Sequence, residues 1–337
     1  MVRVACLLLF LLPLAGCSSP ALASNPSPYM GRSGEAGVGP GDVRLWQDGA
    51  IFQLVGRMID SAHARVLVEM YELGRTEIVA SLGAAQARGV VVRVITDPTV
   101  RASRDSSGQL DLLGVASRAY PIDDGRHQID HVKLLIADAE AAVGGMNWGR
   151  HSERNHDYVL ETRVAADVDR LALVFEQDWA LAGGRPAPLP AWTGAVAQTF
   201  PGTGIRDVLE AALGRAARRV LAEVYTLTDP AVIAELAIAS RRGADVRLIL
   251  DPNQEYNLYP SSLLRSAGVD ARWYPVPRGA LLHAKIGLFD DELLLGSANW
   301  TLSGLGVNHE LDITTEDGGV IAAYRTRFEA DWSRSQE

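Results

Sequence analysis

The strongest constraint on the fold is that the chain carries the same sequence signature twice. VLVEMY at Val66–Tyr71 returns as VLAEVY at Val220–Tyr225, and GGMNW at Gly144–Trp148 returns as GSANW at Gly296–Trp300. The offsets are 154 and 152 residues, whereas a solenoid repeat has a period of roughly 20–50 residues. The 337-residue chain is therefore expected to fold as two tandem copies of one domain, related by a pseudo-twofold axis.

Each copy alternates helical and strand patterns. In the first copy, apolar spacing predicts a helix over 51–62, and buried strands are expected over 66–71 and 90–97. A second helix is expected over 76–88. The polar stretch 99–109 is predicted to be a loop, as is its counterpart 255–260. Three more strands and a closing helix with Phe175 and Trp179 on one face follow. This alternation favours an α/β sandwich with a mixed sheet in each domain.

Composition sets the expected boundaries of these domains. The first domain is predicted over 42–182 and the second over 193–334, because the intervening stretch 183–192 is rich in glycine and proline and is typical of a linker. Residues 18–41 are rich in Ser, Pro, Gly and Ala and lack periodicity, so they are expected to form a flexible tether.

The first 17 residues have the pattern of an export signal. Arg3 precedes an apolar run that is too short to span a membrane. The run ends in Leu14-Ala15-Gly16-Cys17, which resembles the lipobox of bacterial lipoproteins. That resemblance implies cleavage before Cys17, lipidation of Cys17 and anchoring in a bacterial cell envelope. The serines that follow Cys17 favour the outer membrane. The alternative is an ordinary signal cleaved near Ala23.

The two lysines of the chain occupy the same sequence frame. The chain has 32 Lys and Arg residues in total, and only Lys133 and Lys285 are lysines. Each stands two residues after a histidine and five before an aspartate, in the motifs His131-x-Lys133-x(4)-Asp138 and His283-x-Lys285-x(4)-Asp290. A residue so rare would hardly fall twice in one frame by chance, which indicates a chemical reason.

Strand geometry predicts how these motif residues group. Residues i and i+2 of a strand share a face, so His131 lies beside Lys133, and His283 beside Lys285. The same rule pairs Gly145 with Asn147, and Ser297 with Asn299. Pseudo-twofold symmetry could bring both faces together at the interface of the domains. A pocket with two imidazoles, two ammonium groups and two amides suits a phosphodiester, whose oxygens accept hydrogen bonds.

The expected chemistry divides the work between two histidines. One attacks phosphorus and forms a phosphohistidine, while the other protonates the leaving alkoxide and later activates water. The lysines stabilise negative charge on the phosphoryl oxygens. Each imidazole needs an orienting carboxylate, and Asp157 and Glu310, in the repeated NH(D/E) segments, are the candidates. His156 and His309, next to them, are expected to point away.

With both motifs complete, the sequence resembles the phospholipase D superfamily over about Val43 to Trp332. The resemblance implies a two-step reaction without metal or other cofactor, with His131 as nucleophile and His283 as general acid. It also implies that Asp138 and Asp290 are structural. Ser297 and Gly145 occupy the position expected to contact substrate. They differ between the halves, so any contact by the hydroxyl is made in the second half only.

Several functions remain open at this point. The leading hypothesis is hydrolysis of phospholipids to phosphatidic acid and a free headgroup by a monomer at a membrane surface. Transfer to a second alcohol, as by a transphosphatidylase or a cardiolipin synthase, is an alternative. A nuclease is another, and the formal charge of −9 argues against it. An inactive envelope binding protein is the last, and two intact motifs argue against it.

A metal site is disfavoured because each motif histidine has an ammonium group on its own face.

Overall fold

The computed structural model describes residues 41–185, 194–200 and 202–337. The expected signal peptide, the lipidation site Cys17, nearly all of the tether and most of the linker lie outside these residues. The predictions made for those segments therefore stay predictions.

The first half is a seven-stranded sheet with the strand order β1-β7-β6-β5-β2-β3-β4. Strands β2, β3 and β4 are parallel, whereas the pairs from β1 to β2 along that order are antiparallel. The elements of this half are β1 (Val43–Gln47), α1 (Ala50–Ser61), β2 (Arg65–Met70), α2 (Thr76–Ala87), β3 (Val91–Thr96), α3 (Arg101–Leu112), β4 (Ala116–Ala119), η1 (Asp124–Arg126), β5 (Lys133–Ala137), β6 (Glu140–Gly144), η2 (Ser152–Arg154), β7 (Tyr158–Thr162) and α4 (Ala165–Ala182).

The second half repeats this plan. Its sheet has the order β8-β14-β13-β12-β9-β10-β11, which is the first order with each strand replaced by its counterpart. Its elements are β8 (Val196–Thr199), α5 (Gly204–Arg215), β9 (Arg219–Val224), α6 (Pro230–Arg241), β10 (Asp245–Leu250), η3 (Glu255–Asn257), α7 (Leu258–Ser266), β11 (Asp270–Trp273), β12 (Lys285–Phe289), β13 (Glu292–Gly296), β14 (Glu310–Thr315) and α8 (Gly318–Arg334).

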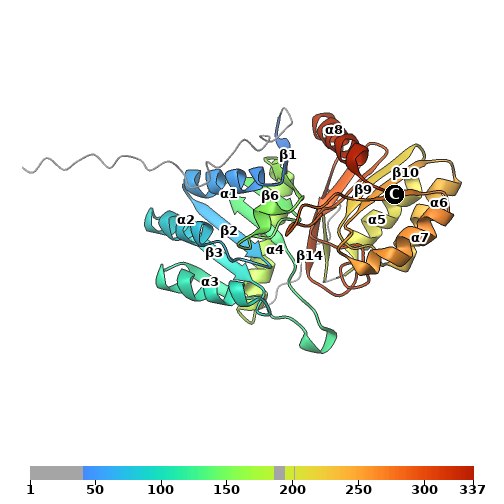
Figure 1. The fold of residues 1–337 in the computed structure, drawn as a ribbon. Helices are drawn as coiled ribbons and strands as arrows, with labels where there is room; N and C mark the ends of the chain where they lie inside the picture. Colours follow the sequence, from blue (N-terminus) through green and yellow to red (C-terminus); the bar gives the residue numbers. More distant parts are fainter. Residues whose placement is uncertain (1–40, 186–193, 201) are drawn as a thin grey trace, which may run out of the picture.

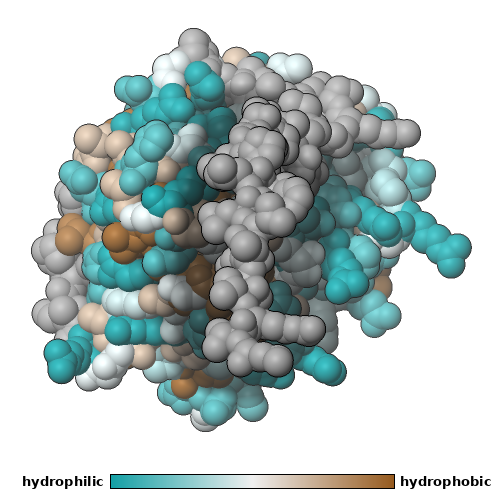
Figure 2. Space-filling model, turned by 90° about the vertical axis from the view of Figure 1, so that its left-hand side faces the viewer, coloured by the Kyte–Doolittle hydropathy of each residue, from teal (hydrophilic) through white to brown (hydrophobic). Residues whose placement is uncertain are grey.

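The two sheets form the inner layers of the molecule. Figure 1 shows α1, α2 and α3 on the outer side of the first sheet and α5, α6 and α7 on the outer side of the second. On the outer face of the first half, hydrophobic residues are scattered among hydrophilic ones wherever the grey atoms leave it visible (Figure 2). No helix in the described ranges is long and apolar enough to cross a membrane.

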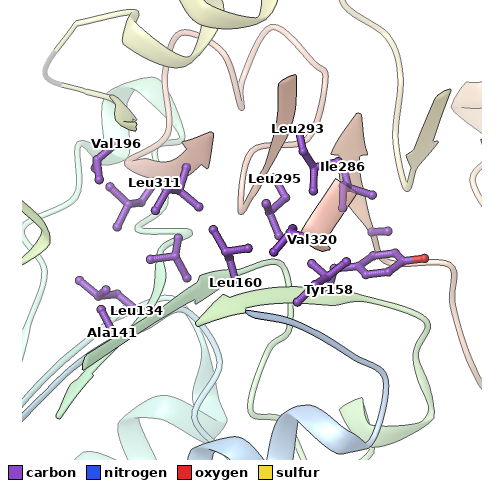
Figure 3. Close-up of a cluster of buried hydrophobic side chains, with 14 of the residues drawn as sticks. Leu134, Ala141, Tyr158, Leu160, Val196, Ile286, Leu293, Leu295, Leu311 and Val320 are labelled. Atoms are coloured by element: carbon purple, nitrogen blue, oxygen red, sulfur yellow. The ribbon is translucent and has the colours of Figure 1, made fainter. Parts of the chain in front are cut away.

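A single hydrophobic core joins the halves. It contains Leu134 and Leu160 from the first sheet and Leu295 and Leu311 from the second, all buried (Figure 3). Helices α4 and α8 add apolar side chains to this core, among them Phe175 and Phe328. Two further cores lie under the outer helices, one in each half. Burying apolar surface between the sheets is the main favourable term that fixes their relative position.

The prediction of loops over 99–109 and 255–260 is wrong. Residues 101–109 of the first stretch belong to α3, and the second stretch belongs to η3 and α7. Helix α3 contacts the sheet through hydroxyl groups: Ser103 Oγ donates to the carbonyl of Tyr71 and Ser106 Oγ to that of Leu73, both at 2.7 Å. Because polar side chains make this contact, the apolar spacing that marks an amphipathic helix is absent.

Candidate active site

The seam between the halves is built by short backbone bridges. The His131 amide donates to the carbonyl of His309 at 2.8 Å, and the His309 amide donates to that of Ile129 at 2.9 Å. The counterparts pair in the same way, with the His283 amide 2.8 Å from the carbonyl of His156. Each His-x-Lys segment therefore lies against the NH(D/E) segment of the other half.

These bridges bring each motif histidine to a carboxylate from the opposite half. His131 Nδ1 lies 2.9 Å from Glu310 Oε2, and His283 Nδ1 lies 2.8 Å from Asp157 Oδ2. All four side chains are buried. A carboxylate on Nδ1 fixes the orientation of the ring and directs Nε2 at the substrate position. The structure thus brings together both pairs, and each pair crosses the seam.

The two lysines lie against the same histidines. Lys133 Nζ donates to the carbonyl of His131 at 2.6 Å, and Lys285 Nζ lies 2.9 Å from Nδ1 of His283. Both lysines are almost completely buried, with 3% and 2% of their surface exposed. Each lysine ammonium group is therefore held beside the histidine of its own motif.

Two tyrosines that were not singled out in the sequence complete these surroundings. The ring centroids of Tyr71 and His131 are 4.8 Å apart, as are those of Tyr225 and His283. The only signal for them is their position as the last residue of each VL(V/A)E(M/V)Y repeat.

The two motif asparagines carry unused hydrogen-bonding capacity. Asn147 and Asn299 follow β6 and β13, and the Oδ1 atom of each is buried without a hydrogen-bond partner among the described residues. Buried amide groups normally have partners, so an unpaired one at a site suggests a group that a ligand satisfies.

Burial and the lysine charges keep both histidines neutral. Burial, followed by the charges of Lys133 and Lys285, holds the pKa of His131 well below its ordinary value. Burial and the charge of Lys285 lower the pKa of His283 to about 3, against the attraction of Asp157. Each imidazole is affected by the lysine of the other half, which indicates that the two motifs share one electrostatic site.

The two lysines and Glu310 titrate near neutral pH. Burial lowers the pKa of Lys133 to about 7, against the attraction of Glu310, and lowers that of Lys285 to about 8. Burial also raises the pKa of Glu310 to about 7, against the charge of Lys133. An anionic ligand between the lysines would stabilise their charged forms.

The first half has Gly145 where the second half has Ser297, and packing explains this difference. A Cβ atom at residue 145 would lie 2.3 Å from Oδ1 of Asp157, so any side chain there would displace this carboxylate. In the second half, Ser297 Oγ donates to Glu310 at 2.6 Å and is fully buried. The Ser297 hydroxyl therefore contacts the carboxylate that orients His131, and Gly145 of the first half makes no such contact. Asn308, which sequence reasoning missed, donates to the other oxygen of Glu310 at 3.1 Å.

The motif aspartates lie at the far end of their strands from the lysines. Asp138 accepts hydrogen bonds from the backbone amides of residues 63, 64 and 65, all within 2.9 Å. Asp290 accepts three equivalent bonds from residues 217, 218 and 219 at 2.9 Å. These bonds tie the start of β2 and β9 to the strands that carry the lysines, so both aspartates hold the fold locally.

His156 and His309 do point away from the dyads, and each enters the other half. His156 Nε2 lies 2.7 Å from Glu223 Oε2, and its Nδ1 lies 2.7 Å from Asp48. Its ring stacks on Tyr274, with centroids 4.9 Å apart. Burial alone would lower the pKa of His156, but the charges of Glu223 and Asp48 raise it well above its ordinary value. We call this cluster, with Asp331, the second-half clasp.

His309 forms the corresponding first-half clasp. Its Nε2 lies 3.1 Å from Asp178 and 3.4 Å from Glu69, and its ring stacks on Tyr120. Glu69 and its counterpart Glu223 had no role in the sequence analysis, and the structure makes them clasp residues. The only sequence signal was that a buried glutamate and a histidine repeat together.

Each clasp also contains the donor types of a cation site. Glu69, Asp130 and His309 place potential ligand atoms within 4.8 Å of one another, as do His156, Glu223 and Asp331. Since salt bridges between the halves already use these imidazole nitrogens, we assign no metal to either clasp.

With two domains of one fold and paired His-x-Lys motifs meeting at their seam, the molecule has the architecture of the phospholipase D superfamily, and the chain belongs to it. The family model described as "Cardiolipin synthase, PLD-like domain" matches twice, over residues 55–179 and 209–332. The predictions of the family and of the α/β fold with two tandem domains are thereby confirmed.

Individual relatives agree with this assignment. Cardiolipin synthase A of Pseudomonas fluorescens is 27% identical to this chain over 88% of it and 69% of the relative. Phosphatidylserine synthase of Haemophilus influenzae shares the fold, with a TM-score of 0.70 and 13% identity over 89% of this chain and 88% of that one. The polyphosphate kinase of Porphyromonas gingivalis has a TM-score of 0.62 and 19% identity over 86% of this chain, which spans 47% of the kinase.

Proposed function

We propose that the protein is a phosphatidyl transferase, which moves the phosphatidyl group of one phospholipid to the hydroxyl group of a second alcohol. The observation that carries the proposal is the pair of His–carboxylate dyads that cross the seam, each with a buried lysine beside it. The match to the cardiolipin synthase family and the cardiolipin synthase relatives support transfer over the hydrolysis that the sequence favoured.

The first step forms a covalent intermediate. Nε2 of His131 attacks phosphorus, the P–N bond forms, and the P–O bond to the leaving alcohol breaks. Glu310 on Nδ1 supports the positive charge that the imidazole gains. Nε2 of His283 gives its proton to the leaving alkoxide, while Asp157 holds Nδ1. Because the low pKa of His283 leaves it neutral in the free protein, it gains this proton when the anionic phosphodiester binds.

The second step reverses the first with a new alcohol. His283 takes the proton of the acceptor hydroxyl, the oxygen attacks phosphorus, and the P–N bond breaks to release neutral His131. The lysines hold the phosphoryl oxygens in both steps. The unpaired Oδ1 atoms of Asn147 and Asn299 are acceptors, so they would accept a hydrogen bond from a donor group of the substrate, such as a hydroxyl. If water attacked the same intermediate, the product would be phosphatidic acid. The two reactions therefore differ only in whether an alcohol or water accepts the phosphatidyl group.

The test is product analysis on vesicles that contain phosphatidylglycerol, followed by lipid mass spectrometry. We expect a product with two phosphatidyl groups and release of glycerol, and neither in the variant His131→Ala. Phosphatidic acid as the sole product would make the protein a hydrolase. No phospholipid product under any condition would overturn the proposal.

A further inference from the structure

Because the two halves share one fold, surface residues at equivalent positions of the halves can be compared directly. Helix α7 with the preceding η3 occupies the same place in the second half as α3 in the first, at a constant offset of 154 residues. The buried positions agree between the copies: Ser103 corresponds to Asn257, and Leu110 to Leu264. Differences at the solvent-facing positions are therefore not required by packing.

The solvent-facing positions differ sharply in chemistry. The second half exposes Tyr256, Leu258, Tyr259 and Leu263, at 73%, 60%, 75% and 45% of their surface. We call these four residues the aromatic patch. Their counterparts in the first half are Ala102, Arg104, Asp105 and Gln109. The fold thus accepts polar side chains at this place, and the patch exposes apolar surface without a structural need for it.

The aromatic patch adjoins the candidate active site. Gln254, two residues before Tyr256, donates to the hydroxyl of Tyr225 at 2.8 Å, and the Tyr225 ring lies 4.8 Å from that of His283. Asn253 lines a pocket of about 640 Å³ that both halves form. The segment that carries the patch therefore begins three residues after a residue that lines this pocket in the seam.

Arginines lie along the same pocket, whose lining also contains Glu72. Arg150 and Arg278 line the same pocket, and Arg154 approaches Gly279 on its edge, at 4.0 Å from a Cβ placed there. All three arginines are exposed, and within the ranges that the structure describes they form no salt bridge. In a chain with a formal charge of −9, this is a local concentration of unpaired positive charge.

We propose that the aromatic patch and these three arginines dock the protein on the surface of an anionic phospholipid bilayer, with the seam pocket facing the lipid. Tyrosine and leucine insert into the headgroup and acyl boundary. Arginines are attracted to anionic lipid within about 10 Å at moderate salt. The inference rests on the proposed function, because it explains how a phospholipid in a bilayer reaches the seam.

The experiment replaces the patch with the residues of the first half. The full chain carries Cys17→Ser, so that no acyl anchor forms, and the variant adds Tyr256→Ala, Leu258→Arg, Tyr259→Asp and Leu263→Gln. A control variant removes two exposed leucines elsewhere, Leu112→Ala and Leu173→Ala.

Binding is measured by co-sedimentation with phosphatidylglycerol vesicles and with phosphatidylcholine vesicles. Turnover is measured on a soluble short-chain phosphatidylglycerol.

We expect the patch variant to bind both kinds of vesicle at least about tenfold more weakly, while its turnover of the soluble lipid is unchanged and shows that it is folded. The control variant should bind like the parent chain. A second variant, Arg150→Gln, Arg154→Gln and Arg278→Gln, should lose only the extra affinity for the anionic vesicles and bind the phosphatidylcholine vesicles like the parent. A patch variant that binds as tightly as the parent would overturn the docking surface. Patch-dependent binding without turnover of any phospholipid would support the docking surface and overturn the proposed function.

Discussion

At the scale of single residues, the seam leaves little space around its cations. The chain uses arginine for positive charge everywhere except at residues 133 and 285. Lys133 reaches the carbonyl of His131 at 2.6 Å, and Lys285 lies between the ring and the carbonyl of His283. A compact ammonium group fits such positions, whereas the planar guanidinium group of arginine is broader and cannot do so without moving the ring.

Lys133→Arg and Lys285→Arg should each keep the fold and lose at least about 100-fold in turnover, because a misplacement of about 1 Å at the reacting atoms costs that much. Steady-state kinetics measures the loss, and circular dichroism checks the fold. Near-native turnover of either variant would show that the steric argument is wrong.

The charges at the site also predict a pH dependence. His131 must be neutral to attack, and its lowered pKa keeps it so at neutral pH. The lysines must be protonated to hold the phosphoryl group, and their pKa values of about 7 and about 8 mean that this charge is lost as the pH rises. On a soluble lipid, kcat/KM should therefore follow a bell-shaped curve that declines above about pH 7. A flat profile from about pH 5 to about pH 9 would contradict this assignment.

At the scale of elements, the sequence predicted the helices and strands in which apolar or functional residues recur at a regular helical or strand spacing. The His-x-Lys strands were recognised because residues two apart share a face, and both copies repeat the pattern. Helix α3 was not predicted from the sequence, because it packs through the hydroxyl groups of Ser103 and Ser106 and lacks a regular apolar spacing. Strands β1, β4, β8 and β11 were not predicted, because each is a short edge strand of four or five residues.

The clasps are a further feature that no local pattern reveals, because each joins residues from both halves. In the second-half clasp, Arg327 of α8 bonds Asp331 at 2.6 Å and Asp48 at 3.1 Å, so Glu223 is the clasp carboxylate whose cationic partner is His156. The corresponding position of the first half is Val174. Removing one partner of a buried ionic group is far more costly than replacing the pair.

His156→Leu should lower the free energy of unfolding by ~3 kcal/mol, and the double variant with Glu223→Leu should recover part of the loss. Urea denaturation provides the measurement, and His63→Ala, at an exposed histidine, is the control. A cost for His156→Leu no larger than that of the control would mean that the clasp does not hold the halves together.

At the scale of the whole molecule, the site exists only where the halves meet. The sequence correctly indicated two similar domains, and it named Asp157 and Glu310 as orienting carboxylates. It could not show that each carboxylate serves the histidine of the other half, since nothing in a linear pattern states which copy faces which. The shared core of Figure 3 and the backbone bridges at His131 and His283 fix that arrangement.

The most direct test of a single seam site is to trap the intermediate. Phosphatidylglycerol vesicles are mixed with the protein and with its His283→Ala variant, the reaction is stopped rapidly in alkaline denaturant to preserve the P–N bond, and peptides are mapped by mass spectrometry. We predict a phosphatidyl group on the peptide that contains His131. In the variant this adduct should form more slowly and last longer, because the variant lacks both the acid of the first step and the base of the second. Continued turnover with no adduct on His131, or an adduct on His283 alone, would contradict the account.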